Sequence, residues 1–190
     1  MKRLLLTGWA VVSCLLCVSC KEDDTEKPEG KTVYDLDVSA YDRWVYFSFE
    51  TGVPKSLGLK EAAPAKWDIA LHRGDVKTNG GSALKTDVTK LSELTQVPSG
   101  KFVSDTLTFD VVVVEADMMQ EIMTYDTTEV NLELGSWVRR SGMPPVYTVA
   151  PQVYVVRTKD GKHAKIRFSS YKSAMDKAGH ATFSYEYPFE

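Results

Sequence analysis

The sequence predicts an all-β fold, a single antiparallel, hairpin-rich domain with at most one or two short helices. Apolar and polar residues alternate from Val33 onward, and turn-forming residues separate the alternating runs. The sequence has no strand-helix-strand rhythm, and because parallel sheets need such crossovers, antiparallel pairing is favoured. With 190 residues, of which 43% are hydrophobic, the chain has the length of one domain and enough apolar residues for a core.

Two strands are predicted in the first half of this domain, at residues 44–50 and 67–72, where side chains alternate in polarity. The apolar face of the first strand consists of Val45, Phe47 and Phe49. Asn79-Gly80 follows the second strand and predicts a tight turn, because both residue types tolerate a positive φ.

A third apolar run lies at residues 102–115, and its segment Val111–Val114 predicts a strand covered on both faces. The pattern changes at residues 115–123, where good helix formers surround apolar residues at helical spacing. These apolar residues are Met118, Met119, Ile122 and Met123. We therefore expect a short helix over residues 115–123, with its methionines packed in the core.

The C-terminal part predicts a hairpin and a final strand. Residues 154–158 and 164–168 flank Asp160-Gly161, which predicts a two-residue turn between two strands. Alternating aromatic residues then mark the last strand, at residues 182–189.

The N-terminus predicts an exported lipoprotein. Residues 1–19 combine a short basic start with an apolar run too short for a comfortable membrane span, as in a signal peptide. The three cysteines of the chain are Cys14, Cys17 and Cys20. The run Cys17-Val18-Ser19-Cys20 resembles a bacterial lipobox, which implies that Cys20 is lipidated and becomes the mature N-terminus. Cys14 follows a similar run and competes as the lipidation site.

Residues 20–31 are predicted to be an acylated, flexible tether, which leaves residues 32–190 as the folded domain. From residue 21 to 31 no aliphatic or aromatic side chain is available for burial. Lys21-Glu22-Asp23-Asp24 resembles the export tag of Bacteroidetes-type outer-membrane lipoproteins, although ordinary linker charges have the same composition. We expect a lipid-anchored protein on the outer membrane, exposed at the cell surface, and the sequence leaves shedding open.

Charge and motifs remove two classes of function. The 23 Lys and Arg residues do not outnumber the 26 Asp and Glu residues, so nucleic-acid binding is not expected. No nucleophile elbow, metalloprotease helix motif or phosphate-binding glycine loop occurs, so we expect no enzyme. His72 and His163 fall at polar positions of strands, where exposed or partly exposed side chains are expected, and His180 lies at the rim of a loop.

Two methionines, Met143 and Met175, stand in loops outside any apolar period. Met143 follows Gly142 and precedes two prolines, and Met175 lies in the segment 171–177. A loop methionine usually fills a gap at the edge of a core, and spacing alone makes neither residue a ligand.

Five blocks of the sequence together resemble the HmuY family of surface lipoproteins, which act as haemophores. The blocks are WDIALHR (67–73), VKTNGG (76–81), GMPPVY (142–147), RTKDGK (157–162) and FSYEYPF (183–189). The resemblance covers most of residues 33–190. It implies an all-β fold whose hairpins grip one haem b, and delivery of that haem to a TonB-dependent outer-membrane receptor.

The resemblance also implies the iron ligands. Members of the family hold iron between two axial side chains from loops near the C-terminal hairpins, two histidines in some members and two methionines in others. The Gly-Met-Pro-Pro block places Met143 as the first ligand, and the second loop offers Met175 or, alternatively, His180. Thioether ligands favour ferrous iron, and two axial ligands leave no open position on the metal, so carriage of haem follows.

Other residues near these loops are candidates for contacts with the porphyrin. Tyr147 and Tyr171 could lie against its ring or could simply pack at strand ends. Arg139, Arg140 and Lys172 could meet the propionates through charge-assisted hydrogen bonds or could remain ordinary surface charges.

A second class of function stays open beside the haemophore. An aromatic β face could bind a glycan or adhere to a host protein, using Trp44, Trp67, Trp137 and the tyrosines. For the haemophore itself, the sequence leaves open whether haem comes from a host haemoprotein or from another bacterium's haemophore.

Overall fold

The computed structural model describes residues 30–190, so the predicted signal peptide and the cysteines lie outside the described residues. The strands are β1 (Lys31–Asp37), β2 (Arg43–Phe47), β3 (Pro54–Gly58), β4 (Ile69–His72), β5 (Asp75–Thr78), β6 (Ser82–Lys85), β7 (Val103–Ser104), β8 (Thr106–Asp117), β9 (Ile122–Val130), β10 (Val138–Ser141), β11 (Val146–Val149), β12 (Tyr154–Arg157), β13 (His163–Lys172) and β14 (Ala178–Phe189). Two short 3₁₀ helices, η1 (Leu91–Glu93) and η2 (Leu134–Trp137), interrupt them. The all-β prediction is confirmed. Across residues 30–190 no helix has the length and apolar character needed to cross a membrane.

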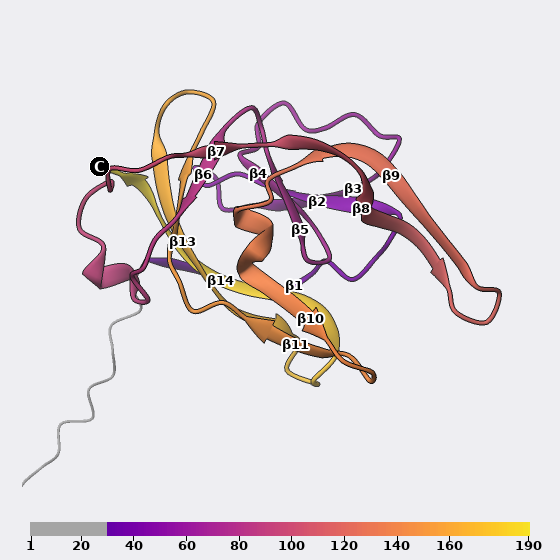
Figure 1. Ribbon diagram of the computed structural model, residues 1–190. Helices are drawn as coiled ribbons and strands as arrows, with labels where there is room; N and C mark the ends of the chain where they lie inside the picture. Colours follow the sequence, from indigo (N-terminus) through magenta and orange to yellow (C-terminus); the bar gives the residue numbers. More distant parts are fainter. Residues whose placement is uncertain (1–29) are drawn as a thin grey trace, which may run out of the picture.

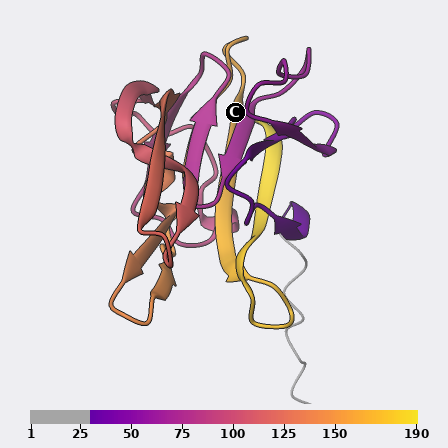
Figure 2. The same ribbon diagram turned by 90° about the vertical axis from the view of Figure 1, so that its right-hand side faces the viewer.

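Two antiparallel sheets form the body of the molecule (Figure 1). One has six strands in the order β1-β14-β13-β12-β6-β7, and the other has four in the order β3-β2-β4-β5. The hairpins β8-β9 and β10-β11 are separate two-stranded sheets. Both hairpins project beyond the body, as Figures 1 and 2 show from two sides.

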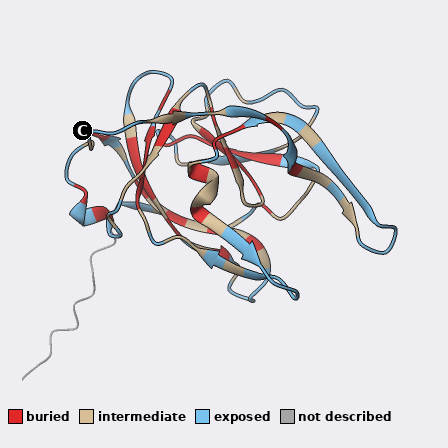
Figure 3. Ribbon diagram, viewed as in Figure 1, coloured by how far each residue is buried: buried red, intermediate tan, exposed pale blue. Residues whose placement is uncertain are grey.

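The main core lies where β2 faces β14. The Phe47 ring meets the rings of Phe183 and Tyr185 nearly at right angles, with centroids 5.3 and 5.4 Å apart. At the other end of this core Trp137 stacks on Phe168 at 4.2 Å. Its indole Nε1 donates a hydrogen bond of 3.0 Å to the Gly74 carbonyl oxygen. Burial follows the two sheets and is lost toward the ends of the projecting hairpins (Figure 3).

The four-stranded sheet is covered on its second face as well. Trp44 and Tyr46, which alternate with the core residues of β2, pack with Val112 and Val130 of the β8-β9 hairpin. The alternation predicted for this strand is therefore confirmed, with both of its faces buried. The β8-β9 hairpin is anchored at its base by this contact.

The helix predicted over residues 115–123 is wrong, because this segment is the end of the β8-β9 hairpin. β8 runs to Asp117, whose carboxylate accepts hydrogen bonds from the backbone amides of Met119 at 2.9 Å and Gln120 at 3.1 Å. A side chain that bonds its own following backbone favours a turn over a helix. The neighbouring prediction for Val111–Val114 is only partly right, since Val112 is buried but Val111 is 38% exposed.

The hairpin predicted around Asp160-Gly161 exists as β12-β13, but its two-residue turn is wrong. Arg157 pairs with His163, which leaves a loop over residues 158–162. The Thr158 amide donates to the Lys162 carbonyl oxygen at 2.8 Å and closes this longer loop. Asp160-Gly161 thus lies inside the loop and does not form the whole turn.

Candidate functional site

A cleft of about 520 Å³ lies between the two projecting hairpins and the β4-β5 turn. This volume falls within the range of roughly 300–1,000 Å³ that small-molecule sites occupy. The β8-β9 hairpin contributes Val111, Val113, Ala116, Met118 and Met123 to its walls. The β10-β11 hairpin contributes Arg140, Met143, Pro145 and Tyr147, and Tyr171 of β13 closes the cleft from the body.

Met143 stands at the end of the β10-β11 hairpin. Ser141 pairs with Val146, so the loop consists of residues 142–145, and Gly142 takes a positive φ of 71° at its start. The Met143 side chain is 78% exposed and lines the cleft. Its sulfur is therefore not used as core filling and is available to a ligand.

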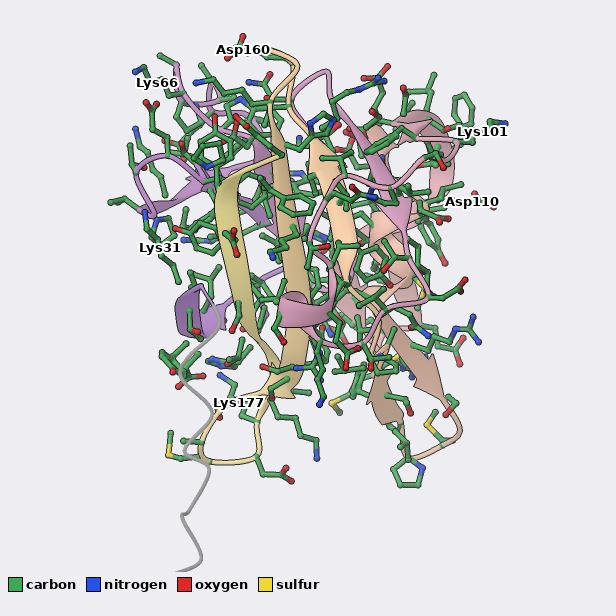
Figure 4. The ribbon with its side chains drawn as sticks, turned by 90° about the vertical axis from the view of Figure 1, so that its left-hand side faces the viewer. Lys31, Lys66, Lys101, Asp110, Asp160 and Lys177 are labelled. Atoms are coloured by element: carbon green, nitrogen blue, oxygen red, sulfur yellow. The ribbon has the colours of Figure 1, made fainter. Side chains whose placement is uncertain are left out.

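Met175 stands at the end of the β13-β14 hairpin. The Ser173 amide donates to the Lys177 carbonyl oxygen at 2.9 Å, and Asp176 completes the loop with a φ of 61°. Met175 is 87% exposed and is not among the residues that line the cleft. Figure 1 shows this loop and the β10-β11 hairpin at the same end of the molecule, and Figure 4 shows Lys177 there.

Tyr147 and Tyr171 connect the two hairpins. Their ring centroids are 4.8 Å apart, and Tyr171 also meets the Trp137 ring at 5.5 Å. Tyr171 is buried, and burial raises its pKa to about 12, so its phenol is neutral at ordinary pH. The pair therefore packs β11 against β13, and both tyrosines also line the cleft.

Of the three basic candidates, Arg140 is the one that lines the cleft. It pairs across the hairpin with Tyr147, and paired residues share a face of a two-stranded sheet. Arg139, the next residue in the strand, therefore faces the other side. Lys172 donates a hydrogen bond of 2.7 Å to the Asp176 carboxylate in its own loop.

Two residues of the cleft, Tyr41 and Arg73, were not anticipated from the sequence. The Arg73 guanidinium lies over the Tyr41 ring, 4.2 Å from its centroid, and donates to the Ser39 carbonyl oxygen at 2.6 Å. Arg73 takes a φ of 53° in the β4-β5 turn, an uncommon conformation for a residue with a side chain. The sequence signal was the segment Arg73-Gly74-Asp75, which directly follows the strand predicted at residues 67–72.

The histidines lie elsewhere. His72 is fully buried, with Nε2 2.9 Å from the Tyr41 carbonyl oxygen and Nδ1 3.4 Å from the Asp75 carboxylate, so its predicted exposure is wrong. The error arises because the β4 strand is covered on both faces. His180 lies in β14 with Nδ1 2.9 Å from a carboxylate oxygen of Asp35 in β1, and it does not line the cleft.

Two further predictions are wrong because the side chains that they concern are not buried or exposed as expected. Met118, Met119 and Met123 were expected in the core, but they are 71%, 96% and 50% exposed at the end of the β8-β9 hairpin. Trp44 and Trp137 were expected on an aromatic face for glycan binding or adhesion, but they are buried in the two cores. A buried indole cannot stack on a sugar ring.

Comparison with solved structures finds the same fold in three bacterial proteins. An HmuY-like haem-binding protein from Bacteroides vulgatus shares 35% identity over 86% of this chain and 94% of its own, with a TM-score of 0.80. A protein from Bacteroides fragilis, classed as a lipoprotein, shares 36% identity over 87% of this chain and 92% of its own, with a TM-score of 0.79. The apo HmuY analogue of Tannerella forsythia shares 28% identity over 84% of this chain and 97% of its own, with a TM-score of 0.71.

No curated protein matches the chain. The family model for HmuY protein matches residues 40–185, which contain the cleft, both methionine loops and the tyrosine pair. This match spans more than half of the chain, and the solved structures share its fold, so the chain belongs to the HmuY family.

Proposed function

We propose that this protein is a haemophore that binds haem b between Met143 and Met175 at the bacterial surface. The observation that carries the proposal is that Met143, an exposed methionine, lines a cleft of about 520 Å³ in a chain of the HmuY family. The solved relatives support the cargo, since one is an HmuY-like haem-binding protein.

The two methionines have the properties that axial ligands need. Each stands at the end of its own hairpin and is largely exposed, so no packing contact must be broken for its sulfur to reach iron. The Tyr147–Tyr171 contact holds the two hairpins together and limits how far the sulfurs can separate. Two thioethers would occupy both axial positions of the iron, so the protein would carry haem and would not activate oxygen or peroxide on it.

The cleft also offers partners for the rest of the porphyrin. Tyr147 and Tyr171 supply aromatic surface beside the ligand hairpins. Arg140, and Arg73 on the opposite wall, are the cationic groups that we assign to the propionates. Arg139 and Lys172 lie outside the cleft lining, so we give them a smaller share in propionate binding.

Haem would be held without a covalent bond. Residues 21–190 contain no cysteine, so no thioether link to the vinyl groups can form in the folded domain. Acid extraction should therefore release all bound haem as unmodified iron protoporphyrin IX. Haem that stays with the polypeptide after extraction would contradict this part of the proposal.

The direct test is haem titration of the purified domain, followed by its Soret band. The wild-type protein should give a sharp, shifted band. Met143→Ala should lower the affinity and remove the six-coordinate spectrum, and Met175→Ala should lower the affinity. His180→Ala should leave both unchanged, because the His180 side chain is only 13% exposed and both of its ring nitrogens are buried. If His180→Ala removes the six-coordinate spectrum and Met175→Ala does not, His180 is the second ligand.

Surface attachment would follow from lipidation of Cys20 in the N-terminal segment. Stable anchoring needs two or more acyl chains, as bacterial lipoproteins carry. Cys20→Ala should move the protein from the membrane fraction to the soluble fraction, and Cys14→Ala should not. The reverse result would place the lipid on Cys14.

From this position the protein would deliver haem to a TonB-dependent receptor in the outer membrane, after taking it from a host haemoprotein or another haemophore. Loaded protein mixed with receptor-containing membranes should lose its Soret band as the membranes gain it. Membranes without the receptor are the control, and equal loss to both would contradict specific delivery.

A further inference from the structure

The end of the β8-β9 hairpin carries methionines that the proposed axial pair does not use. Within residues 30–190 the hairpin pairs with no other strand, and its residues 118–125 are exposed. The strand register shifts between Thr108 and Val112 and again between Val113 and Glu115. Such bulges bend a two-stranded sheet and re-aim its side chains. Figure 1 shows the hairpin as a curved arm that projects from the body.

Two methionines of this arm line the same cleft as Met143. Met118 and Met123 belong to the β8-β9 hairpin and Met143 to the β10-β11 hairpin, so thioethers reach one cleft from two independent elements. Met175, by contrast, lies outside the cleft lining. The methionines that line this cleft together with Met143 are therefore those of the arm.

The arm methionines are not packing residues. Met118 is 71% exposed and Met123 is 50% exposed. The Tyr125 hydroxyl donates a hydrogen bond of 2.9 Å to the Met123 sulfur. A thioether sulfur has two lone pairs, so this bond restricts the side chain and still leaves one pair for a metal.

We propose that Met118 and Met123 form a third thioether position for haem iron, which can replace Met175 opposite Met143. This inference rests on the proposed function and extends it, because it gives the cargo two ligand sets that share Met143. Haem could then be held by Met143 and the arm while the β13-β14 loop is withdrawn. Each set supplies soft sulfur ligands, so the exchange would not change the preference for ferrous iron.

The test uses Met175→Ala as the background, with haem reduced by dithionite. If the arm supplies a ligand, Met175→Ala alone keeps a substantial fraction of six-coordinate haem. Adding Met118→Ala and Met123→Ala should convert it to five-coordinate haem and weaken binding further, by roughly tenfold. All three side chains are exposed, so the substitutions should leave the melting temperature unchanged.

Met119→Ala in the same background is the matched control. Met119 lies in the same turn and is 96% exposed but does not line the cleft, so its loss should change nothing. Met123→His in the Met175→Ala background gives a positive signature, because the spectrum should change from two thioethers to one thioether and one imidazole. If Met175→Ala and the triple variant have the same five-coordinate spectrum, the arm supplies no ligand and the inference is wrong.

That outcome leaves the proposed function standing, provided that Met143→Ala still weakens haem binding in the otherwise wild-type chain. If the wild-type protein gives no shifted Soret band, or if Met143→Ala has no effect, the proposed function and the arm position are both overturned.

Discussion

The rings of Tyr147 and Tyr171 lie 4.8 Å apart and join the two hairpins that carry the proposed ligands. Tyr147 follows Met143 by four residues in its hairpin, and Tyr171 precedes Met175 by four residues in the other. The contact therefore joins the two hairpins at points that are equally far along the chain from their methionines. The buried indole of Trp137 packs edge-on against the Tyr171 ring.

Tyr147→Ala should weaken haem binding about fivefold, because an aromatic pair contributes on the order of 1 kcal/mol beyond its buried area. Its loss frees the β10-β11 hairpin from β13 and removes one wall of the cleft. Haem titration measures the effect, with Tyr34→Ala as the control because Tyr34 is 74% exposed on β1. Equal affinities for the two variants would show that the contact does not organise the site.

Tyr171 should make folding sensitive to alkaline pH. Its pKa rises from the ordinary value of 10.0 to about 12 in the folded state, because burial disfavours the phenolate. Above pH 10 the unfolded chain releases this proton while the folded chain keeps it, so the free energy of unfolding falls as pH rises from 10 toward 12. Below pH 10 both states hold the proton and the slope disappears.

Tyr171→Phe tests this, since it keeps the ring and removes the ionisable group. Between pH 9 and pH 12, the free energy of unfolding measured with urea should fall more for the wild-type protein than for Tyr171→Phe. The two decreases should differ by about 2 kcal/mol at most. Parallel curves would mean that Tyr171 titrates in the folded state as it does in the unfolded chain.

Lys165 should be important for stability away from the site. Its buried ammonium donates to the carbonyl oxygens of Leu91 at 3.0 Å and Leu94 at 2.9 Å and lies 3.0 Å from the Glu186 carboxylate. Lys165→Met leaves these two carbonyl groups without their donor and should cost about 1–3 kcal/mol in the free energy of unfolding. Lys66→Met is the control, because the Lys66 side chain is 78% exposed. A urea midpoint that drops equally for both variants would contradict this stabilising role of Lys165.

The fold class could be predicted because alternation is a local property of each strand. The faces of β2 came out as expected, since Val45 and Phe47 turn to one core and Trp44 and Tyr46 to the other. Residues 115–123 misled the prediction, because methionines at helical spacing outweighed Asp117, whose side chain closes the hairpin turn. The exposure of His72 was misjudged because period-two patterning does not reveal a strand covered on both faces.

The candidate site could be predicted only in part. The loop positions of Met143 and Met175 followed from the family resemblance, and the two tyrosines from their closeness in sequence. The opposite wall of the cleft could not be foreseen, because Arg73 and Met118 reach it from segments far apart in the chain. Only the packing of the β8-β9 hairpin on β2 and β4 brings those segments beside Met143.

The measurement that tests the central claim most directly is the Soret spectrum and haem affinity of Met143→Ala, Met175→Ala and the double variant, each in air and after dithionite reduction. We predict a large loss of affinity for Met143→Ala, a smaller loss for Met175→Ala and near abolition for the double variant. The losses should be larger for ferrous haem, because thioether ligands favour that state. A double variant that binds haem as tightly as the wild-type protein, with an unchanged six-coordinate spectrum, would contradict methionine ligation.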